Sequence, residues 1–388
     1  MPVTDNKSKP GPRAANDPYG HKVQALSALL YKLAVERGVG AKLPTIRELS
    51  DELQTSSSSI DIALKDLEAR NVIYRKRGSG IYVSPKIHRK NIAVVFNSYL
   101  LGANASPFWG ILLSHLAKYA ETRGQTSNQD FEFFMTSPSR GRNALPDHVM
   151  NLVRSGAIAG VVGISLNDEG ARWILDQGIP CISYAGWSKW TVLTGGEQLI
   201  QDGLKVLADQ GCRNIEYWGL PHSDGDNPVW YEQTRVVVET AYGALGLEPP
   251  QTLVGPAEDL LLAGSALPAR KQDALYRAYT AIKALFSDPA RVRPDGIFVA
   301  DDMMASRVLF GLMELGVRPG VDIKIASLAN RGSPILFGLE QYLTLLEYDP
   351  AEIVDALIQL LDQAMAAPDL PETQISVPWR PRVPEEFK

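Results

Sequence analysis

Cysteine, histidine and long apolar runs are all scarce in this chain. Its 388 residues include only two cysteines, Cys181 and Cys212, without the C-x-x-C spacing of metal or redox motifs. Two isolated thiols favour a reducing compartment over a disulfide framework. No apolar run approaches the roughly 18 residues of a membrane-spanning helix, and the N-terminus lacks the apolar core of a secretory signal. We therefore expect a cytoplasmic protein without a disulfide, metal site or membrane span.

Groups arranged for catalysis are also missing. The five histidines show no metal-ligand spacing and suggest no Ser-His-Asp arrangement. A pyridoxal-phosphate enzyme needs a lysine on a polar active-site loop to form its Schiff base, and five lysines lack that context: Lys189, Lys205, Lys271, Lys283 and Lys324. The sequence predicts no enzymatic activity and no cofactor. An aminotransferase-like body is the leading enzyme alternative, and its cofactor would colour the purified protein.

Charge is unevenly distributed along the chain. The whole sequence has a formal net charge of −5, which alone argues against nucleic acid. Residues 18–90 carry 13 Lys and Arg against 7 Asp and Glu, a net of +6, so the remainder carries −11. A small basic segment joined to an acidic body is typical of a DNA-binding module fused to a domain that does not bind DNA.

The basic segment has the pattern of two helices followed by a hairpin. Apolar residues recur at helical spacing on both sides of a Ser-rich run, at Leu49, Leu53, Ile60, Leu64 and Leu67. The run from Thr55 to Ser59 breaks the first helix and supplies hydroxyls that can cap the second. Residues 75–83 predict a strand, a Gly-rich tip and a second strand with three consecutive cations. This pattern predicts a winged helix-turn-helix, which presents one helix to a DNA major groove.

The rest of the chain divides around this module. Residues 1–18 are polar and Pro-rich, which predicts a disordered arm. We assign residues 19–84 to the DNA-binding domain and the basic residues 85–90 to a linker that could act as a hinge. From residue 91 to residue 388, apolar strands alternate with helices, as in an α/β fold with parallel sheets covered on both faces. This length suits two sheets and an effector-binding and dimerisation domain.

Aromatic residues gather where the predicted strands end, which is where parallel α/β domains bind ligands. Five of the seven tryptophans lie in these segments: Trp109, Trp187, Trp190, Trp218 and Trp230. Aromatic planes beside polar groups suit sugar rings, which have apolar faces and hydroxylated edges. Core or hinge packing remains the alternative for any single tryptophan.

The winged module resembles the GntR family of bacterial transcription regulators. The matching motifs are Leu43-Pro44, Arg47-Glu48-Leu49, Ala63-Leu64, Leu67-Glu68 and Gly78-Ser79-Gly80. Family members usually carry arginines where this chain has Ser57 and Asp61, so the resemblance does not transfer guanine-reading arginines. It implies DNA contacts by Arg47, Ser56, Ser58, Ser59 and Gly80, to which we add Ser57, Lys65, Arg75, Arg77 and Ser79 from the same helix and wing. Asp61 would repel phosphate or accept from a cytosine amino group.

Segments after residue 90 resemble the LacI/GalR family. They are Ser106-Pro107-Phe108-Trp109, Gly178-Ile179-Pro180-Cys181-Ile182, Arg235 (with Val238 replacing a family glycine), and Ile297 to Ala305 followed by Glu314-Leu315-Gly316. The resemblance implies a two-lobed, periplasmic-binding-protein-like domain whose chain crosses between lobes near Trp190, Leu328 and Tyr348. It also implies effector contacts by Phe108, Trp109, Arg235, Asp301, Asp302 and Tyr348, and the aromatic pattern adds Trp187 and Trp230. For Asp301 and Asp302, capping of the following helix is the alternative.

Together these features predict a dimeric, ligand-responsive transcriptional repressor, in an arrangement that resembles arabinose-repressor-type regulators. Its partners would be double-stranded operator DNA, a small sugar-like effector and a second copy of the chain. A sensor that has lost DNA binding is one alternative, suggested by Ser57 and Asp61. An effector of another class, a nucleoside or an amino acid, is a second.

Overall fold

The computed structural model describes residues 18–102, 105–123, 128–136, 145–219, 228–249 and 274–384, with backbone alone at residues 18–22, 24, 228–234 and 274. The expected arm, up to residue 17, lies outside the described residues. The chain divides into two compact units. The first draws on residues up to Ala93, on Thr122–Glu132 and on Pro146–Gly160, and the second draws on the others.

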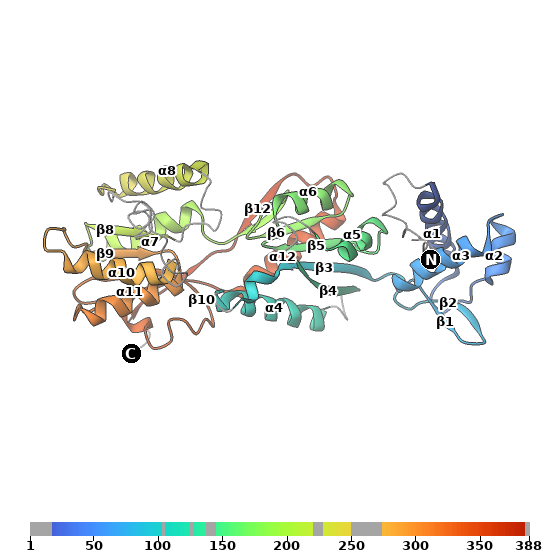
Figure 1. Ribbon diagram of the computed structural model, residues 1–388, viewed down its shortest axis with the longest axis horizontal. Helices are drawn as coiled ribbons and strands as arrows, with labels where there is room; N and C mark the ends of the chain where they lie inside the picture. Colours follow the sequence, from blue (N-terminus) through green and yellow to red (C-terminus); the bar gives the residue numbers. More distant parts are fainter. Residues whose placement is uncertain are drawn as a thin grey trace, which may run out of the picture. The chain divides into compact units, whose positions relative to one another are not determined.

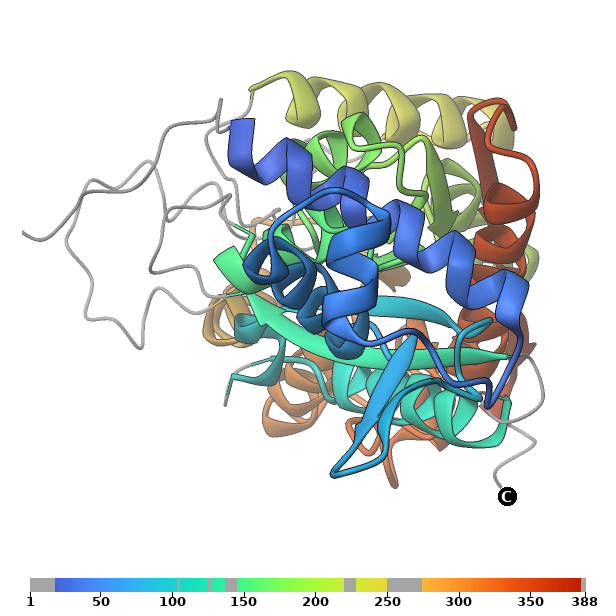
Figure 2. The ribbon, with the colours of Figure 1, turned by 90° about the vertical axis from the view of Figure 1, so that its right-hand side faces the viewer.

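The first elements of the chain form a helical head with a two-stranded wing. The head consists of α1 (Pro18–Arg37), α2 (Ile46–Glu52), α3 (Ser57–Ala69), β1 (Ile73–Lys76) and β2 (Gly80–Val83). Figure 2 turns the head toward the viewer and shows the hairpin projecting from the helices. Leu30, Leu49 and Leu64 meet in its core, at 1% exposure or less. The predicted helix-turn-helix and basic hairpin are confirmed.

Local capping explains where α2 and α3 begin. The Thr45 side chain accepts from the Glu48 backbone N–H, and the Glu48 carboxylate accepts from the Thr45 N–H, a capping box that starts α2. These bonds hold the pKa of Glu48 below its usual value. Ser56 caps α3 by accepting from the Ser59 N–H at 3.2 Å. The Ser-rich run therefore ends one helix and starts the next, as expected.

A six-stranded sheet follows in the order β12-β7-β6-β5-β3-β4 (Figure 1). Its elements are β3 (Lys90–Asn97), η1 (Ser98–Leu101), α4 (Pro107–Arg123), β4 (Gln129–Thr136), α5 (Asp147–Arg154), β5 (Gly160–Ile164), α6 (Asp168–Asp176), β6 (Cys181–Tyr184), β7 (Trp190–Leu193), α12 (Pro350–Ala366) and β12 (Thr373–Ser376). Pairing is parallel from β5 through β6 and β7 to β12. Helix α12 packs on β6 and β7.

A second sheet has five strands in the order β13-β11-β10-β9-β8 (Figure 1). Its elements are α7 (Glu197–Asp209), β8 (Ile215–Trp218), α8 (Pro228–Leu245), α10 (Ala274–Ser287), β9 (Gly296–Val299), α11 (Asp302–Glu314), β10 (Lys324–Asn330), η4 (Glu340–Tyr342), β11 (Thr344–Tyr348) and β13 (Arg380–Arg382). Strands β8 to β11 pair in parallel, and β13 joins β11 antiparallel. These are the parallel sheets that the alternating pattern predicted.

The chain passes between the two sheets three times. It leaves the six-stranded sheet after Leu193, returns at Asp349 and leaves again between Ser376 and Arg380. The first and second passages agree with the crossings expected near Trp190 and Tyr348. The crossing expected near Leu328 is wrong, because Leu328 lies within β10 and pairs with Leu346 of β11 in the same sheet.

Candidate functional site

Helix α3 presents one polar face and buries the other. Ile60, Ala63, Leu64 and Leu67 are fully buried in the core of the head. Ser57, Ser58 and Lys65 are exposed on the opposite side, as 3.6-residue periodicity requires. Arg47 on α2 is exposed as well. These four side chains are therefore open to a ligand as large as DNA.

Ser59 differs from the other predicted DNA contacts. Its side chain is buried, at 3% exposure, and its hydroxyl lies 2.8 Å from the Ser56 hydroxyl. Because its backbone N–H is also taken by Ser56, Ser59 stabilises the first turn of α3. Burial therefore disfavours the expected DNA contact by Ser59, which stays a prediction, whereas Ser56 is exposed.

The wing is a tight antiparallel hairpin. Lys76 pairs with Gly80 at its end, and Arg77, Gly78 and Ser79 form the turn. Gly78 and Gly80 have φ of +72° and +128°, conformations that side-chain-bearing residues rarely adopt. A Cβ at Gly80 would lie 2.7 Å from Cε of Lys42. The glycines therefore allow the turn, and Arg77 is exposed at its tip.

Asp61 does not stand alone on the exposed face of α3. Its carboxylate lies 3.0 Å from Nζ of Lys65 and 2.9 Å from Nη2 of Arg75 on β1. Hydrogen bonds from Lys65 and then Arg75 hold the pKa of Asp61 below its usual value. Asp61 therefore forms ion pairs on this face, and its predicted effect on DNA, repulsion of phosphate or acceptance from a cytosine amino group, stays a prediction.

Three aromatic rings meet where strands of the six-stranded sheet end. The ring centroid of Phe108 is 4.9 Å from that of Trp109 and 5.9 Å from that of Tyr184, the last residue of β6. Phe108 and Tyr184 are buried, whereas Trp109 is partly exposed. The predicted pair is thus brought together, with Phe108 supporting the more accessible indole of Trp109.

Two polar residues join this strand-end region. The Tyr99 hydroxyl lies 2.6 Å from the hydroxyl of Ser165. Ser165 and Ala185 follow β5 and β6 with φ of +51° and +53°, uncommon for residues with side chains. Ser165 directly follows β5, and Tyr99 lies in η1, which directly follows β3, so both stand just after the end of a strand.

The remaining tryptophans serve different purposes. Trp190 and Trp218 are each 3% exposed and pack in cores, so the packing alternative holds for both. Trp187 is partly exposed, and the guanidinium of Arg172 stacks 3.9 Å from its ring centroid. The side chain of Trp230 lies outside the described residues.

Two adjacent carboxylates follow β9 in the five-stranded sheet. Asp301 caps α11 by accepting from the Met304 N–H at 2.7 Å, as the capping alternative predicted. Burial, aided by the charge of Asp302, raises the pKa of Asp301 to about 6. Asp302 is 3% exposed, and it accepts a 2.9 Å hydrogen bond from the Ser333 hydroxyl. Burial also raises the pKa of Asp302.

Arg235 and Tyr348 have identified partners other than these carboxylates. Nη1 of Arg235 lies 2.8 Å from Oε1 of Glu239, one turn along α8. Tyr348 is 2% exposed, with its hydroxyl at the Gly195 backbone, and burial raises its pKa to about 12. In the described conformation Tyr348 thus packs at the ends of two passages between the sheets, and its accessibility to an effector is low.

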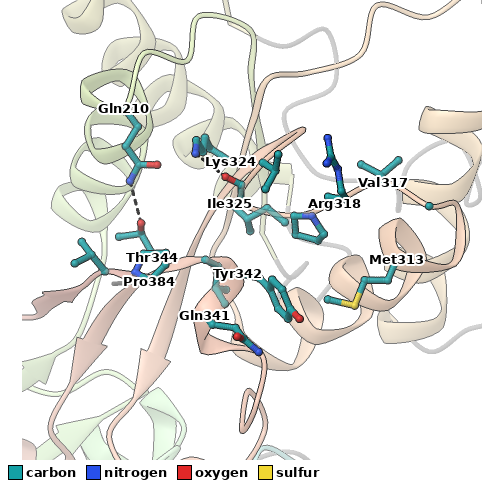
Figure 3. Close-up of a pocket in the computed structure, with 16 residues that line it drawn as sticks. Gln210, Met313, Val317, Arg318, Lys324, Ile325, Gln341, Tyr342, Thr344 and Pro384 are labelled. Atoms are coloured by element: carbon teal, nitrogen blue, oxygen red, sulfur yellow. Dashed lines mark hydrogen bonds between the residues drawn. The ribbon is translucent and has the colours of Figure 1, made fainter. Parts of the chain in front are cut away.

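A cavity of about 870 Å³ opens elsewhere on the five-stranded sheet (Figure 3). Its lining includes Lys324 and Thr344, which begin β10 and β11, so it lies at the strand ends opposite Asp301. Gln210 donates to the Thr344 hydroxyl at 2.9 Å, and the Lys324 ammonium donates to the Gly320 carbonyl. None of the predicted effector residues lines this cavity.

Comparisons with known proteins identify the two parts of the chain. Residues 24–83 match the family of bacterial regulatory proteins called the gntR family. Residues 204–383 match the periplasmic binding protein-like domain. A comparison with curated protein sequences gave no match.

Several of the solved structures that resemble the chain are transcriptional regulators, two of them described as members of the LacI family. A regulatory protein of the LacI family from Chloroflexus aggregans is 19% identical, with a TM-score of 0.55 over 74% of this chain and 96% of that one. A LacI family regulator from Arthrobacter sp. FB24, in complex with lactose, is 18% identical, with a TM-score of 0.54 over 76% and 98%. The transcriptional regulator CelR, in complex with cellobiose, is 15% identical, with a TM-score of 0.55 over 88% and 99%.

The chain therefore joins a GntR-type helix-turn-helix head to a periplasmic-binding-protein-like α/β domain. Both resemblances found in the sequence are confirmed. The matched families define a transcriptional regulator and not an enzyme. Among the described residues, no helix is long and apolar enough to cross a membrane, and no group of His, Cys, Asp and Glu could hold a metal ion.

Proposed function

We propose that the chain is a cytoplasmic, homodimeric repressor that binds operator DNA through its head and responds to a small sugar. One observation carries this proposal. A head with an exposed basic wing shares a chain with two sheets that each place groups suited to a ligand near strand ends: Trp109 beside Tyr184 on one, and Asp301 beside Asp302 on the other.

On the DNA side, the proposed contacts come from the exposed face of α3, from α2 and from the wing. They are Arg47, Ser56, Ser57, Ser58, Lys65, Arg75, Arg77, Ser79 and Gly80. The domain limits that we propose are residues 19–84 for the DNA-binding domain, 85–90 for the linker and 91–388 for the effector and dimerisation domain. Operator half-sites about one helical turn apart would follow from the two-fold symmetry of a dimer.

On the effector side, the two groups complement each other chemically. The partly exposed indole of Trp109 offers an apolar plane for one face of a sugar ring. Asp301 and Asp302 offer acceptors for hydroxyls, and burial raises the pKa of both carboxyls. Phe108, Trp187, Trp230, Arg235 and Tyr348 complete the proposed effector residues. Lactose and cellobiose in two of the similar structures favour a sugar over a nucleoside or an amino acid.

A thermal-shift screen tests the effector proposal directly. Full-length protein is heated with monosaccharides, disaccharides, nucleosides and amino acids, since a ligand at one hundred times its Kd adds about 2.7 kcal/mol of stability. We expect one sugar to raise Tm, and Trp109→Ala to abolish that rise. Tyr276→Ala, which removes an aromatic ring 43% exposed on α10, is the matched control and should respond as the wild type does. A rise with a nucleoside or amino acid alone would refute the sugar assignment.

The responding ligand then tests the regulatory proposal. Binding of the full chain to operator DNA is measured with and without that ligand, and a repressor relieved by its effector should lose affinity. A conformational coupling of about 1–3 kcal/mol would change affinity by roughly 5- to 150-fold. Unchanged DNA binding at saturating ligand would contradict ligand-responsive regulation.

A further inference from the structure

The recognition helix of this regulator carries almost no cationic side chain. Between Ser57 and Ala69, Lys65 is its sole Lys or Arg. A flexible ammonium makes a poor bidentate partner for a base edge, whereas arginine can donate two parallel hydrogen bonds to guanine. Sequence-specific binding by the head therefore calls for an arginine supplied by another element.

Arg75 of β1 lies against this helix. Its Nη2 is 2.9 Å from Oδ1 of Asp61, and its Nε is 3.1 Å from Oε2 of Glu68. Asp61 and Glu68 are seven residues apart and so lie on one face of α3. Lys65 lies between them and is 3.0 Å from Asp61. The guanidinium of a wing residue is thereby held on the exposed face of the recognition helix.

The two carboxylates leave Arg75 able to bind another partner. A guanidinium has five N–H donors, and the contacts with Asp61 and Glu68 use one nitrogen each. The remaining hydrogens include one on each terminal nitrogen, the pair that reads the O6 and N7 atoms of guanine. Arg75 also keeps 33% of its side chain exposed. Because both carboxylates fix its position beforehand, less rotamer entropy is lost on binding.

Arg77 provides a contrast on the same hairpin. It is exposed at the tip of the wing, and within the described residues no carboxylate forms an ion pair with it. A long, untethered cation of this kind suits a phosphate, which requires charge but little precision. The wing thus carries one positioned arginine and one free arginine.

We propose that Arg75 is a base-reading residue of this regulator and that Asp61 and Glu68 are the positioning residues that aim it at a guanine. This inference rests on the proposed function, since it requires that the head bind a specific operator. The acidic residue on the recognition helix then promotes specific binding, although its charge disfavours DNA in general.

The direction in which Asp61→Asn changes operator affinity distinguishes this positioning role from simple charge repulsion. Asp61→Asn removes a negative charge beside the DNA, so charge alone predicts tighter binding to every sequence. Loss of positioning predicts weaker binding to the operator and equal or tighter binding to unrelated DNA. The ratio of the two affinities is the informative quantity.

The experiment uses the full chain throughout. An operator is selected from a pool of random DNA duplexes, and Kd is measured for it and for a scrambled duplex at several salt concentrations. We expect Asp61→Asn to lower the operator-to-scrambled ratio by about 10-fold or more, within the range for one bidentate contact. Arg75→Lys keeps the charge and should lower the ratio similarly, with affinity for scrambled DNA unchanged. Selection repeated with Arg75→Lys should lose a guanine preference that the wild type shows.

Arg77→Ala is the matched control. It should weaken binding to both duplexes equally and reduce the salt slope by about one. Melting curves show whether each variant is folded. If Asp61→Asn does not fold, Arg75→Lys still tests the inference. A ratio unchanged in Arg75→Lys, or Asp61→Asn tightening both duplexes equally, overturns the inference alone. A wild-type chain that selects no operator overturns the proposed function and this inference with it.

Discussion

Asp301→Asn should stabilise the protein near neutral pH. Burial and the nearby charge of Asp302 raise the pKa of Asp301 from 3.8 to about 6, so its ionised form is disfavoured in the native state. A shift of about two units corresponds to on the order of 3 kcal/mol. Asparagine is about as good a helix N-cap as aspartate, so the substitution keeps the hydrogen bond with Met304 and removes the charge.

The expected gain depends on pH. Because the native pKa is raised, the carboxyl contributes stability that is fully present below the unfolded pKa near 3.8 and is lost as pH rises through about 6. Asp301→Asn should therefore raise Tm above pH 7 by about 6 °C, at roughly 2 °C per kcal/mol for a domain of this size. The gain should shrink steadily below pH 6. Melting curves of wild type and variant between pH 5 and pH 8 measure both trends.

Asp349 provides the contrast for this substitution. It also caps a helix, accepting from the Ala351 N–H at 2.9 Å, but its carboxylate lies 2.6 Å from Nη1 of Arg331. Asp349→Asn removes that ion pair and should lower Tm. If Asp301→Asn also lowers Tm at pH 7.5, the native site stabilises the ionised Asp301 and the reasoning from burial fails. If the Asp301 carboxylate binds the effector, Asp301→Asn should also lose the rise in Tm on addition of sugar, whether its Tm without ligand rises or falls.

Four further substitutions probe the wing and the tryptophans. Gly80→Ala should lower the free energy of unfolding by about 1–3 kcal/mol and weaken DNA binding, because φ is +128° and the new Cβ meets Lys42. Gly78→Ala should cost less stability, because the space around its Cβ is open. Denaturant titrations that give equal losses of stability for the two variants would contradict this account. Trp218→Ala should destabilise the protein by about 3–5 kcal/mol because that indole is buried. Trp109→Ala should leave Tm nearly unchanged in the absence of ligand, and a large loss would assign Trp109 to packing instead.

The head could be predicted from sequence because its signals are local. The apolar stripe through Ile60 and Leu64, the Ser56 cap and the Gly-rich wing tip depend on neighbours within a few residues. Strands such as β5 and β9 were predictable for a similar reason, since every residue in them is buried and apolar runs of strand length mark buried parallel strands.

The tertiary contacts were not predictable in this way. The Asp61–Arg75 pair joins residues 14 positions apart across two elements, so the sequence showed an acid on a DNA-facing helix but not its partner. In β12, partly buried residues alternate with exposed ones, and β13 is mostly exposed, so neither strand has an apolar run that a sequence pattern could detect. Only their pairing with β7 and β11 identifies them as strands. The third passage, between Ser376 and Arg380, joins these two strands and was not predicted, whereas the crossing near Leu328 came from the family resemblance.

Burial decided between alternatives that the sequence left open. Ser59, Trp190, Trp218 and Tyr348 have the residue types of binding sites, but each is buried at 3% exposure or less. Side-chain chemistry alone does not show which face of an element points inward. Asp301 combines both roles, as a helix cap and as a polar group beyond a strand.

The order in which the chain leaves the ribosome follows from its three passages between the sheets. The core of the head is complete once Ile87 has emerged, whereas the six-stranded sheet needs α12 and β12, which end only at Ala366 and Ser376. Until then β7 has one unpaired edge, and β6 and β7 lack the helix that packs on them. At 5–20 residues per second, roughly 15 to 60 seconds of synthesis separate the two events. The nascent regulator therefore carries a finished DNA-binding head well before it carries a finished sensor.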